Sequence, residues 1–122
     1  MIECPRCEGQ GMICEARVKE YSFFICDECD SLKSLKGAPK EVGDDFNCGK
    51  CNSLTSLKGA PEKIGWDFDC SRCPSLTSLE GAPKEVGRDF ECYDCKIKFT
   101  EEDVRNVSNV QHEIILKRPI NY

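Results

Sequence analysis

Residues 26–95 consist of three consecutive copies of a 22-residue unit, followed by the beginning of a fourth. The copies begin at Cys26, Cys48 and Cys70 with no insertion between them, and the fourth begins at Cys92 and then diverges. A fixed period in this range is typical of a solenoid, in which each unit buries its apolar side chains only against its neighbours. The repeat therefore predicts a β-rich solenoid built as a stack of about four short parallel strands.

The apolar residues of each unit indicate which side of the chain faces the core. Residues two apart on a strand point to the same side, so Phe68 and Cys70 are expected to point inward together. Leu76 and Leu79 continue this core after the strand. A Gly-Ala-Pro turn follows in every unit, and its proline excludes an ordinary helix. The residues expected to return to the core after this turn are Val42, Ile64 and Val86.

The spacing of Phe68, Cys70, Cys73, Leu76 and Leu79 resembles the leucine-rich repeat, in the short form common in bacterial and tailed-phage proteins. The resemblance covers about 70 residues and implies one strand and one turn per unit. A cysteine occupies the position that the family gives to asparagine or cysteine, and phenylalanine stands in place of a leucine. Glycine stands where the first apolar residue of the family pattern is expected.

The composition and the start of the chain favour a protein of the cytoplasm. The chain contains 11 cysteines, and Met-Ile-Glu-Cys at its start is not a secretory signal, so we expect metal sites instead of disulfides. No apolar run reaches the ~18 residues of a membrane-spanning helix, so no membrane contact is expected. The formal net charge of −5 disfavours nucleic acid as a partner.

Two Cys-x-x-Cys pairs near the N-terminus have the spacing of a structural zinc site. Cys4 and Cys7 form the first pair, and Cys26 and Cys29 form the second, at a separation typical of such sites. Two such turns supply the four thiolates of a closed tetrahedral site, so the sequence predicts at least one zinc ion here. We therefore expect an N-terminal zinc-binding cap at 1–25 that shares ligands with the first repeat, then repeats at 26–95 and a C-terminal cap at 96–122.

The Cys-x-x-Cys turns within the repeats allow two interpretations. In the first, these cysteines are small core residues and need no metal. In the second, turns from neighbouring repeats hold a second zinc ion, because their strands lie about 4.8 Å apart. The ligands of this second site would be Cys48, Cys51, Cys70 and Cys73. No role is assigned to Cys14, Cys92 and Cys95.

Acidic residues occupy the outward positions of the predicted strands. They form one column of Asp45, Asp67 and Asp89 and a second column of Asn47, Asp69 and Glu91. A solenoid presents this surface to its partners, which predicts an acidic face for a protein partner with a basic surface. The alternative is a solvated face that only keeps an edge-rich fold soluble.

Two aromatic residues lie beside these columns. Tyr93 follows Gly49 and Ser71 in a third outward column. Trp66 occupies the position of Asp44 and Arg88 in the sister repeats, so it is expected to be exposed. An exposed tryptophan beside a charged face is a candidate anchor for a partner, and the alternative is that it covers a turn.

The last segment leaves the repeat and has the features of a cap. Thr100 followed by three acidic residues predicts the start of a helix, with Val104 and Val107 facing the last repeat. Residues 112–116 predict a strand that closes the solenoid, and His112 is expected to be a surface residue. The sequence FTEEDVR at 99–105 resembles the tail of phage-encoded repeat proteins of this kind.

The absent motifs disfavour an enzyme. The sequence contains no nucleophile–base set and no phosphate-binding loop of the G-x₄-G-K-[ST] type. We therefore expect a zinc-stabilised protein–protein interaction module, and the resemblance implies a phage-encoded modulator that binds a protein in the host cytoplasm. The alternatives are a structural spacer of a particle and a zinc-ribbon nucleic-acid binder, and the oligomeric state is left open.

Overall fold

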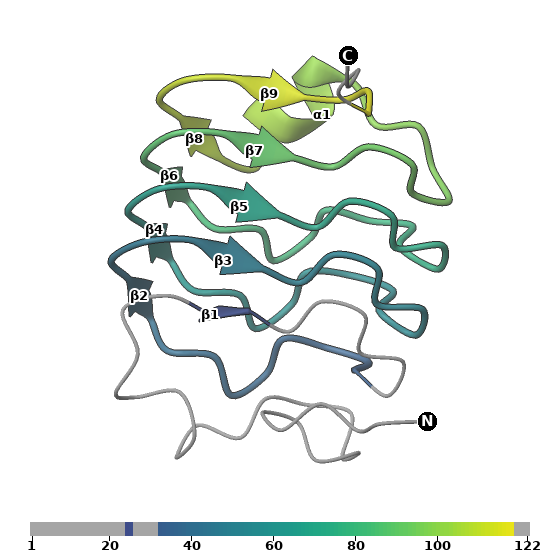
Figure 1. The fold of residues 1–122 in the computed structure, drawn as a ribbon, viewed down its shortest axis with the longest axis horizontal. Coiled ribbons are helices and arrows are strands. Elements are labelled where there is room, and N and C mark those ends of the chain that lie inside the picture. The colour runs from purple at the N-terminus through teal and green to yellow at the C-terminus, as the bar shows by residue number, and fades with distance from the viewer. Residues whose placement is uncertain (1–23, 26–31, 119–122) are drawn as a thin grey trace.

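The structure is a computed structural model that describes residues 24–25 and 32–118. These residues wind into a parallel β-solenoid of about three turns, with two parallel sheets along its length (Figure 1). The β-rich solenoid predicted from the repeat is confirmed. No helix of this described part has the length and apolar character needed to cross a membrane.

The first sheet contains the strands that the repeat predicts and one further strand at each end. Its order is β1 (Phe24–Ile25), β3 (Phe46–Asn47), β5 (Phe68–Asp69), β7 (Phe90–Glu91) and β9 (Ile114–Ile115). Phe46 pairs with Phe68, and Phe68 with Phe90, so β3, β5 and β7 follow one another at one 22-residue period. The sequence period is therefore the length of one turn of the solenoid.

The second sheet was not expected, because the repeat predicted one strand per unit. Its order is β2 (Glu41–Val42), β4 (Lys63–Ile64), β6 (Glu85–Val86) and β8 (Asn109–Val110). The first residue of each repeat strand is exposed and the second is buried, as the return of Val42, Ile64 and Val86 to the core predicted. Each turn therefore contributes two short strands, because the segment after the Gly-Ala-Pro turn pairs with its copies as well.

Ladders of identical side chains fill the interior. Phe46, Phe68 and Phe90 are each fully buried, with ring centroids 5.5 Å apart for the first pair and 5.1 Å for the second. Such contacts stabilise aromatic pairs by about 0.5–1.5 kcal/mol beyond their burial. Phe68 and Cys70 both lie inside, which confirms the predicted inward face of the strand. Further buried columns are Leu32, Leu54 and Leu76, and Leu35, Leu57 and Leu79.

After Cys92 the sequence no longer follows the repeat, but the end of the chain still adds one strand to each sheet. Helix α1 (Glu101–Arg105) begins after Thr100, whose side chain accepts a hydrogen bond from the backbone N–H of Asp103, as predicted. Val104 is fully buried in the core, and Val107 packs against it. The chain then forms β8 and β9, and Phe90 pairs with Ile114. The turn that holds α1 is thus two residues longer than the others.

Candidate protein-interaction face

The outward surface of the first sheet carries the two acidic columns. We call Asp45, Asn47, Asp67, Asp69, Asp89 and Glu91 the acidic face. On β3, β5 and β7 the phenylalanine is buried and the following polar residue is partly exposed. This alternation places Asn47, Asp69 and Glu91 on the outside, one per turn, as the sequence predicted.

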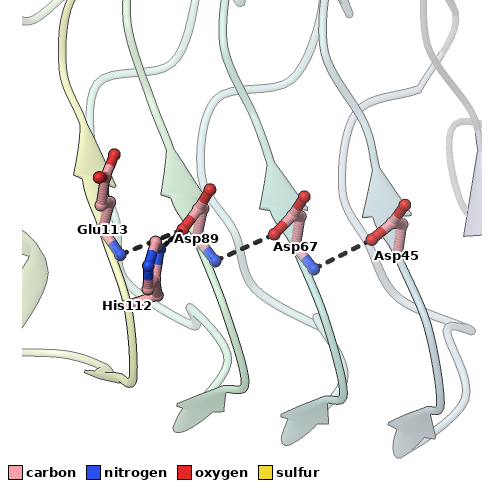
Figure 2. A network of polar contacts seen from close by, with 5 residues as sticks. All are labelled: Asp45, Asp67, Asp89, His112 and Glu113. Atoms are coloured by element: carbon pink, nitrogen blue, oxygen red, sulfur yellow. Dashed lines mark hydrogen bonds and ion pairs between the residues drawn. The ribbon is translucent and has the colours of Figure 1, made fainter.

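The first acidic column is a hydrogen-bonded ladder and not a row of independent carboxylates. Oδ1 of Asp45 accepts from the backbone N–H of Asp67 at 3.1 Å, and Oδ1 of Asp67 accepts from that of Asp89 at 3.0 Å. Figure 2 shows the same contact continuing from Asp89 to the backbone N–H of Glu113, at 3.1 Å. The column therefore links successive turns, a role that was not predicted from the sequence.

Glu113 is a member of this column that was missed in the sequence. It occupies in the last turn the position of Asp89 in the turn before, but the longer last turn displaces it from the sequence period. The sequence feature that could have identified it is an acidic residue directly before an inward apolar residue, as Asp89 precedes Phe90 and Glu113 precedes Ile114. His112 is exposed, as predicted, and its Nδ1 lies 2.7 Å from Oδ1 of Asp89. Burial raises the pKa of Asp89, but the hydrogen bonds from His112 and Glu113 outweigh it and hold the pKa below its usual value.

The second acidic column ends in an unusual carboxyl group. The side chains of Asn47 and Asp69 accept hydrogen bonds from the backbone N–H groups two residues later, at 2.9 and 2.8 Å. Glu91 lies between Asp69 on β5 and Ile115 on β9, so no cationic residue flanks it in the register. Partial burial and the charges of the neighbouring aspartates raise the pKa of Glu91 to about 7. Ionisation of Glu91 is therefore opposed by the carboxylates that lie around it at this end of the acidic face.

The third predicted column is mostly buried. Gly49 and Ser71 have little exposed surface and Tyr93 is half-exposed, but all three line a depression on the outer side beside Asn47 and Asp69, which agrees with the predicted outward column. They are covered because successive turns of the solenoid pack closely here: the backbone N–H of Tyr93 donates to Oγ of Ser71, one turn earlier, at 3.1 Å. This depression is open and has a volume of about 200 Å³. Its lining includes Asn47, Lys50, Asp69, Ser71, Arg72 and Tyr93.

Trp66 is exposed, as its sister positions predicted. Its relative exposure is 47%, and the guanidinium carbon of Arg88 lies 4.7 Å from the centre of its ring. Trp66 follows β4 and precedes β5, so it lies where the chain passes from one sheet to the other. The cation–π contact holds the ring at the border of the acidic face.

The repeat cysteines make the contacts of core thiols. Sγ of Cys73 lies 3.4 Å from the carbonyl oxygen of Cys48, and Sγ of Cys95 lies 3.4 Å from that of Cys70. Burial raises the pKa of Cys73 to about 12, which keeps the thiol protonated and able to donate this bond. These contacts agree with the core interpretation.

The two predicted zinc sites lie in different parts of the chain. Among the described residues, no group of three or more Cys, His, Asp or Glu side chains is arranged to hold a metal ion. The second site, at Cys48, Cys51, Cys70 and Cys73, therefore receives no support from this geometry and stays a prediction. The first site, at Cys4, Cys7, Cys26 and Cys29, lies outside the described residues.

Comparison of the chain with known protein families, with curated proteins and with solved structures finds no match. The acidic face itself is therefore the basis for a functional proposal.

Proposed function

We propose that this protein is a non-catalytic interaction module that binds a protein with a basic surface through its acidic face. The clustering of carboxylates carries the proposal, because Asp69 and Glu91 are direct neighbours in the strand register. Burial and then the charges of the surrounding aspartates raise the pKa of Glu91 to about 7, which supports it. A cationic side chain of a partner placed between these carboxylates would relieve their repulsion.

The architecture supports the same function. Solenoids use their extended strand surfaces for binding, and here that surface carries one acidic or amide side chain per turn in each column. Tyr93 and Trp66 border the face, and aromatic residues of this kind are frequent anchors in interfaces. The resemblance of the repeat to phage-encoded repeat proteins extends the proposal to a modulator that binds a host protein.

The test compares variants that remove the same charge from different sheets. At pH 8.5, where Glu91 is ionised, Asp69→Asn together with Glu91→Gln removes two charges from the acidic face, and the amide introduced at the first position can still accept from the backbone N–H of Ser71. The matched control, Glu41→Gln with Glu62→Gln, removes two charges from exposed positions at the second sheet. The probe is a fluorescein-labelled peptide of alternating lysine and serine, measured by fluorescence anisotropy at low salt.

We expect the acidic-face variant to bind this peptide about tenfold more weakly than the wild type, and the control to bind nearly as well as the wild type. Equal losses in both variants would mean that only net charge matters, and the proposal would then be wrong. Circular dichroism of each variant confirms that the fold is retained.

We also propose that at least one zinc ion stabilises the N-terminal segment, with Cys4, Cys7, Cys26 and Cys29 as ligands. The spacing of these cysteines supports the proposal. Native mass spectrometry of anaerobically purified protein should find zinc in the wild type and one ion fewer in the Cys4→Ser/Cys7→Ser variant. A second ion that survives this substitution would support the site at Cys48, Cys51, Cys70 and Cys73. A folded wild-type protein without metal would contradict both sites.

A further inference from the structure

The depression beside the acidic face contains charges of both signs. Its lining includes the carboxylate of Asp69 together with the cationic residues Lys50 and Arg72. Asp69 and Arg72 belong to the same turn and are three residues apart, which is at most about 10 Å of extended chain. The surface therefore changes from negative to positive within a short distance at this end of the strands.

The guanidinium of Arg72 lies near an aromatic ring, and one of its nitrogens lacks a hydrogen-bond partner within the described part of the chain. Its Nε is buried and has no hydrogen-bond partner among the residues that the structure describes. Its guanidinium carbon lies 5.8 Å from the centre of the Tyr93 ring. A buried donor without an acceptor is uncommon and unfavourable in a folded protein, and an acceptor that entered the depression would satisfy it once the Arg72 side chain shifts outward.

The backbone and the neighbouring turn both favour an external acceptor. Arg72 has a φ of 59° and Lys50 a φ of 58°, a left-handed conformation that is uncommon for residues with a Cβ and fixes where their side chains leave the chain. The residue at the same position one turn later is Asp94, but its Oδ2 accepts from Nη2 of Arg118 at 2.8 Å. The carboxylate that follows in this column is thus already paired with another arginine.

We infer that the depression is a carboxylate-binding site, in which Arg72 and Tyr93 hold an Asp or Glu side chain of the partner. This inference rests on the proposed function, because the same partner places its basic groups on Asp69 and Glu91. The partner surface is therefore bipolar: a basic row contacts the acidic face, and an acidic residue beside that row reaches Arg72.

The test asks which of two peptides, one with glutamates and one with glutamines, the protein binds more tightly. One fluorescein-labelled peptide has the sequence KSKGSEGSE, and its counterpart has glutamine in place of both glutamates. A surface that is only acidic should bind the glutamine peptide more tightly, because that peptide has the larger positive charge. A carboxylate site at Arg72 predicts the opposite order, with the glutamate peptide bound about fivefold more tightly.

Variants at Arg72 assign the effect to this residue. In Arg72→Gln the order should reverse, so that the glutamine peptide is bound more tightly. Arg72→Lys keeps the charge but loses the planar donor group, so it should retain only part of the preference. Arg88→Gln is the matched control, because it removes one arginine charge at Trp66 and outside the depression, and it should leave the order unchanged.

Two results would overturn the inference. A wild-type protein that prefers the glutamine peptide disproves the carboxylate site but leaves the acidic face intact. A preference for glutamate that Arg72→Gln and Arg88→Gln reduce equally shows that no specific site exists. Failure of the wild type to bind either peptide, or the lysine–serine peptide, would remove the proposed function together with the inference.

Discussion

At the scale of single residues, a column of glycines leaves no room for a side chain between adjacent turns. A Cβ added to Gly65 would overlap the carbonyl oxygen of Gly43 in the turn before, and one added to Gly87 would overlap that of Gly65. This contact explains why glycine stands where the leucine-rich repeat has an apolar residue. Any larger residue at this position would place its Cβ against the backbone of the preceding turn.

Gly65→Ala should therefore destabilise the protein by about 2–3 kcal/mol, because the backbone of a neighbouring turn must move to admit one methyl group. Urea denaturation measures the change in free energy of unfolding. Gly49→Ala is the matched control, since its Cβ would lie 3.1 Å from the carbonyl oxygen of Ser71 and needs a much smaller adjustment. If both variants lose the same stability, the close approach at Gly65 is not the cause.

Glu91 makes the stability of the protein depend on pH. Its pKa in the folded protein is raised to about 7 from an ordinary value of 4.5, mainly by burial and then by the neighbouring aspartates. The folded state therefore binds this proton more tightly than the unfolded state. The resulting stabilisation is complete below pH 4.5 and is lost as the pH rises through about 7.

Glu91→Gln should abolish this dependence, because the amide does not ionise. At pH 8 we expect the variant to melt about 2 °C above the wild type, a small gain because the site is partly exposed to solvent. At pH 5 the difference should be close to zero. Thermal melts followed by circular dichroism at both pH values check this, and a pH-independent difference would show that Glu91 is not the titrating group.

At the scale of elements, the aspartate ladder adds side-chain hydrogen bonds between turns. The backbone N–H of Asp89 donates to Oδ1 of Asp67, and this contact is partly buried. Each aspartate thus fixes the turn that follows it, as the row in Figure 2 shows. An amide in place of the carboxylate preserves the acceptor and also reduces the repulsion along the column.

Asp67→Ala should lower the free energy of unfolding by about 1 kcal/mol, because it leaves the N–H of Asp89 without its acceptor. Asp67→Asn should be neutral or slightly stabilising. Glu62→Ala, at an exposed position beside the second sheet, controls for loss of one negative charge. Chemical denaturation distinguishes the role of Asp67 as a hydrogen-bond acceptor from the role of its negative charge. If Asp67→Asn destabilises the protein as much as Asp67→Ala, the negative charge and not the acceptor is required.

The elements also show how far the sequence determines the structure. The first sheet could be predicted, because Phe68 and Cys70 alternate with polar residues and repeat in every unit. The second sheet could not, since a two-residue strand such as Lys63–Ile64 has no alternation to detect. The acidic columns were predicted, but the ladder was not, because it depends on the side-chain rotamers of aspartates one turn apart. The position of Arg72 depends on a positive φ that its residue type does not indicate.

At the scale of the whole molecule, every described strand pairs only with strands one turn away. Phe46 pairs with Phe68, and Phe68 with Phe90, while the last turn is longer because it accommodates α1. Stability should then be close to a sum over turns and over the interfaces between neighbours. A turn is removable in principle, provided that the register of both sheets is preserved.

Deletion of residues 53–74 removes one complete 22-residue period and joins Asn52 to Ser75, which keeps every inward position inward. We expect this shorter protein to fold cooperatively, with a lower melting temperature and a denaturant m-value reduced roughly in proportion to the chain removed. Deletion of residues 53–63 is the control: it removes half a period and places Ile64 where a loop residue should be, so both sheets lose their register. This control should lack cooperative unfolding by circular dichroism. If both deletions folded equally well, the turns would not be held by register, and if neither folded, the solenoid would depend on contacts that reach beyond adjacent turns.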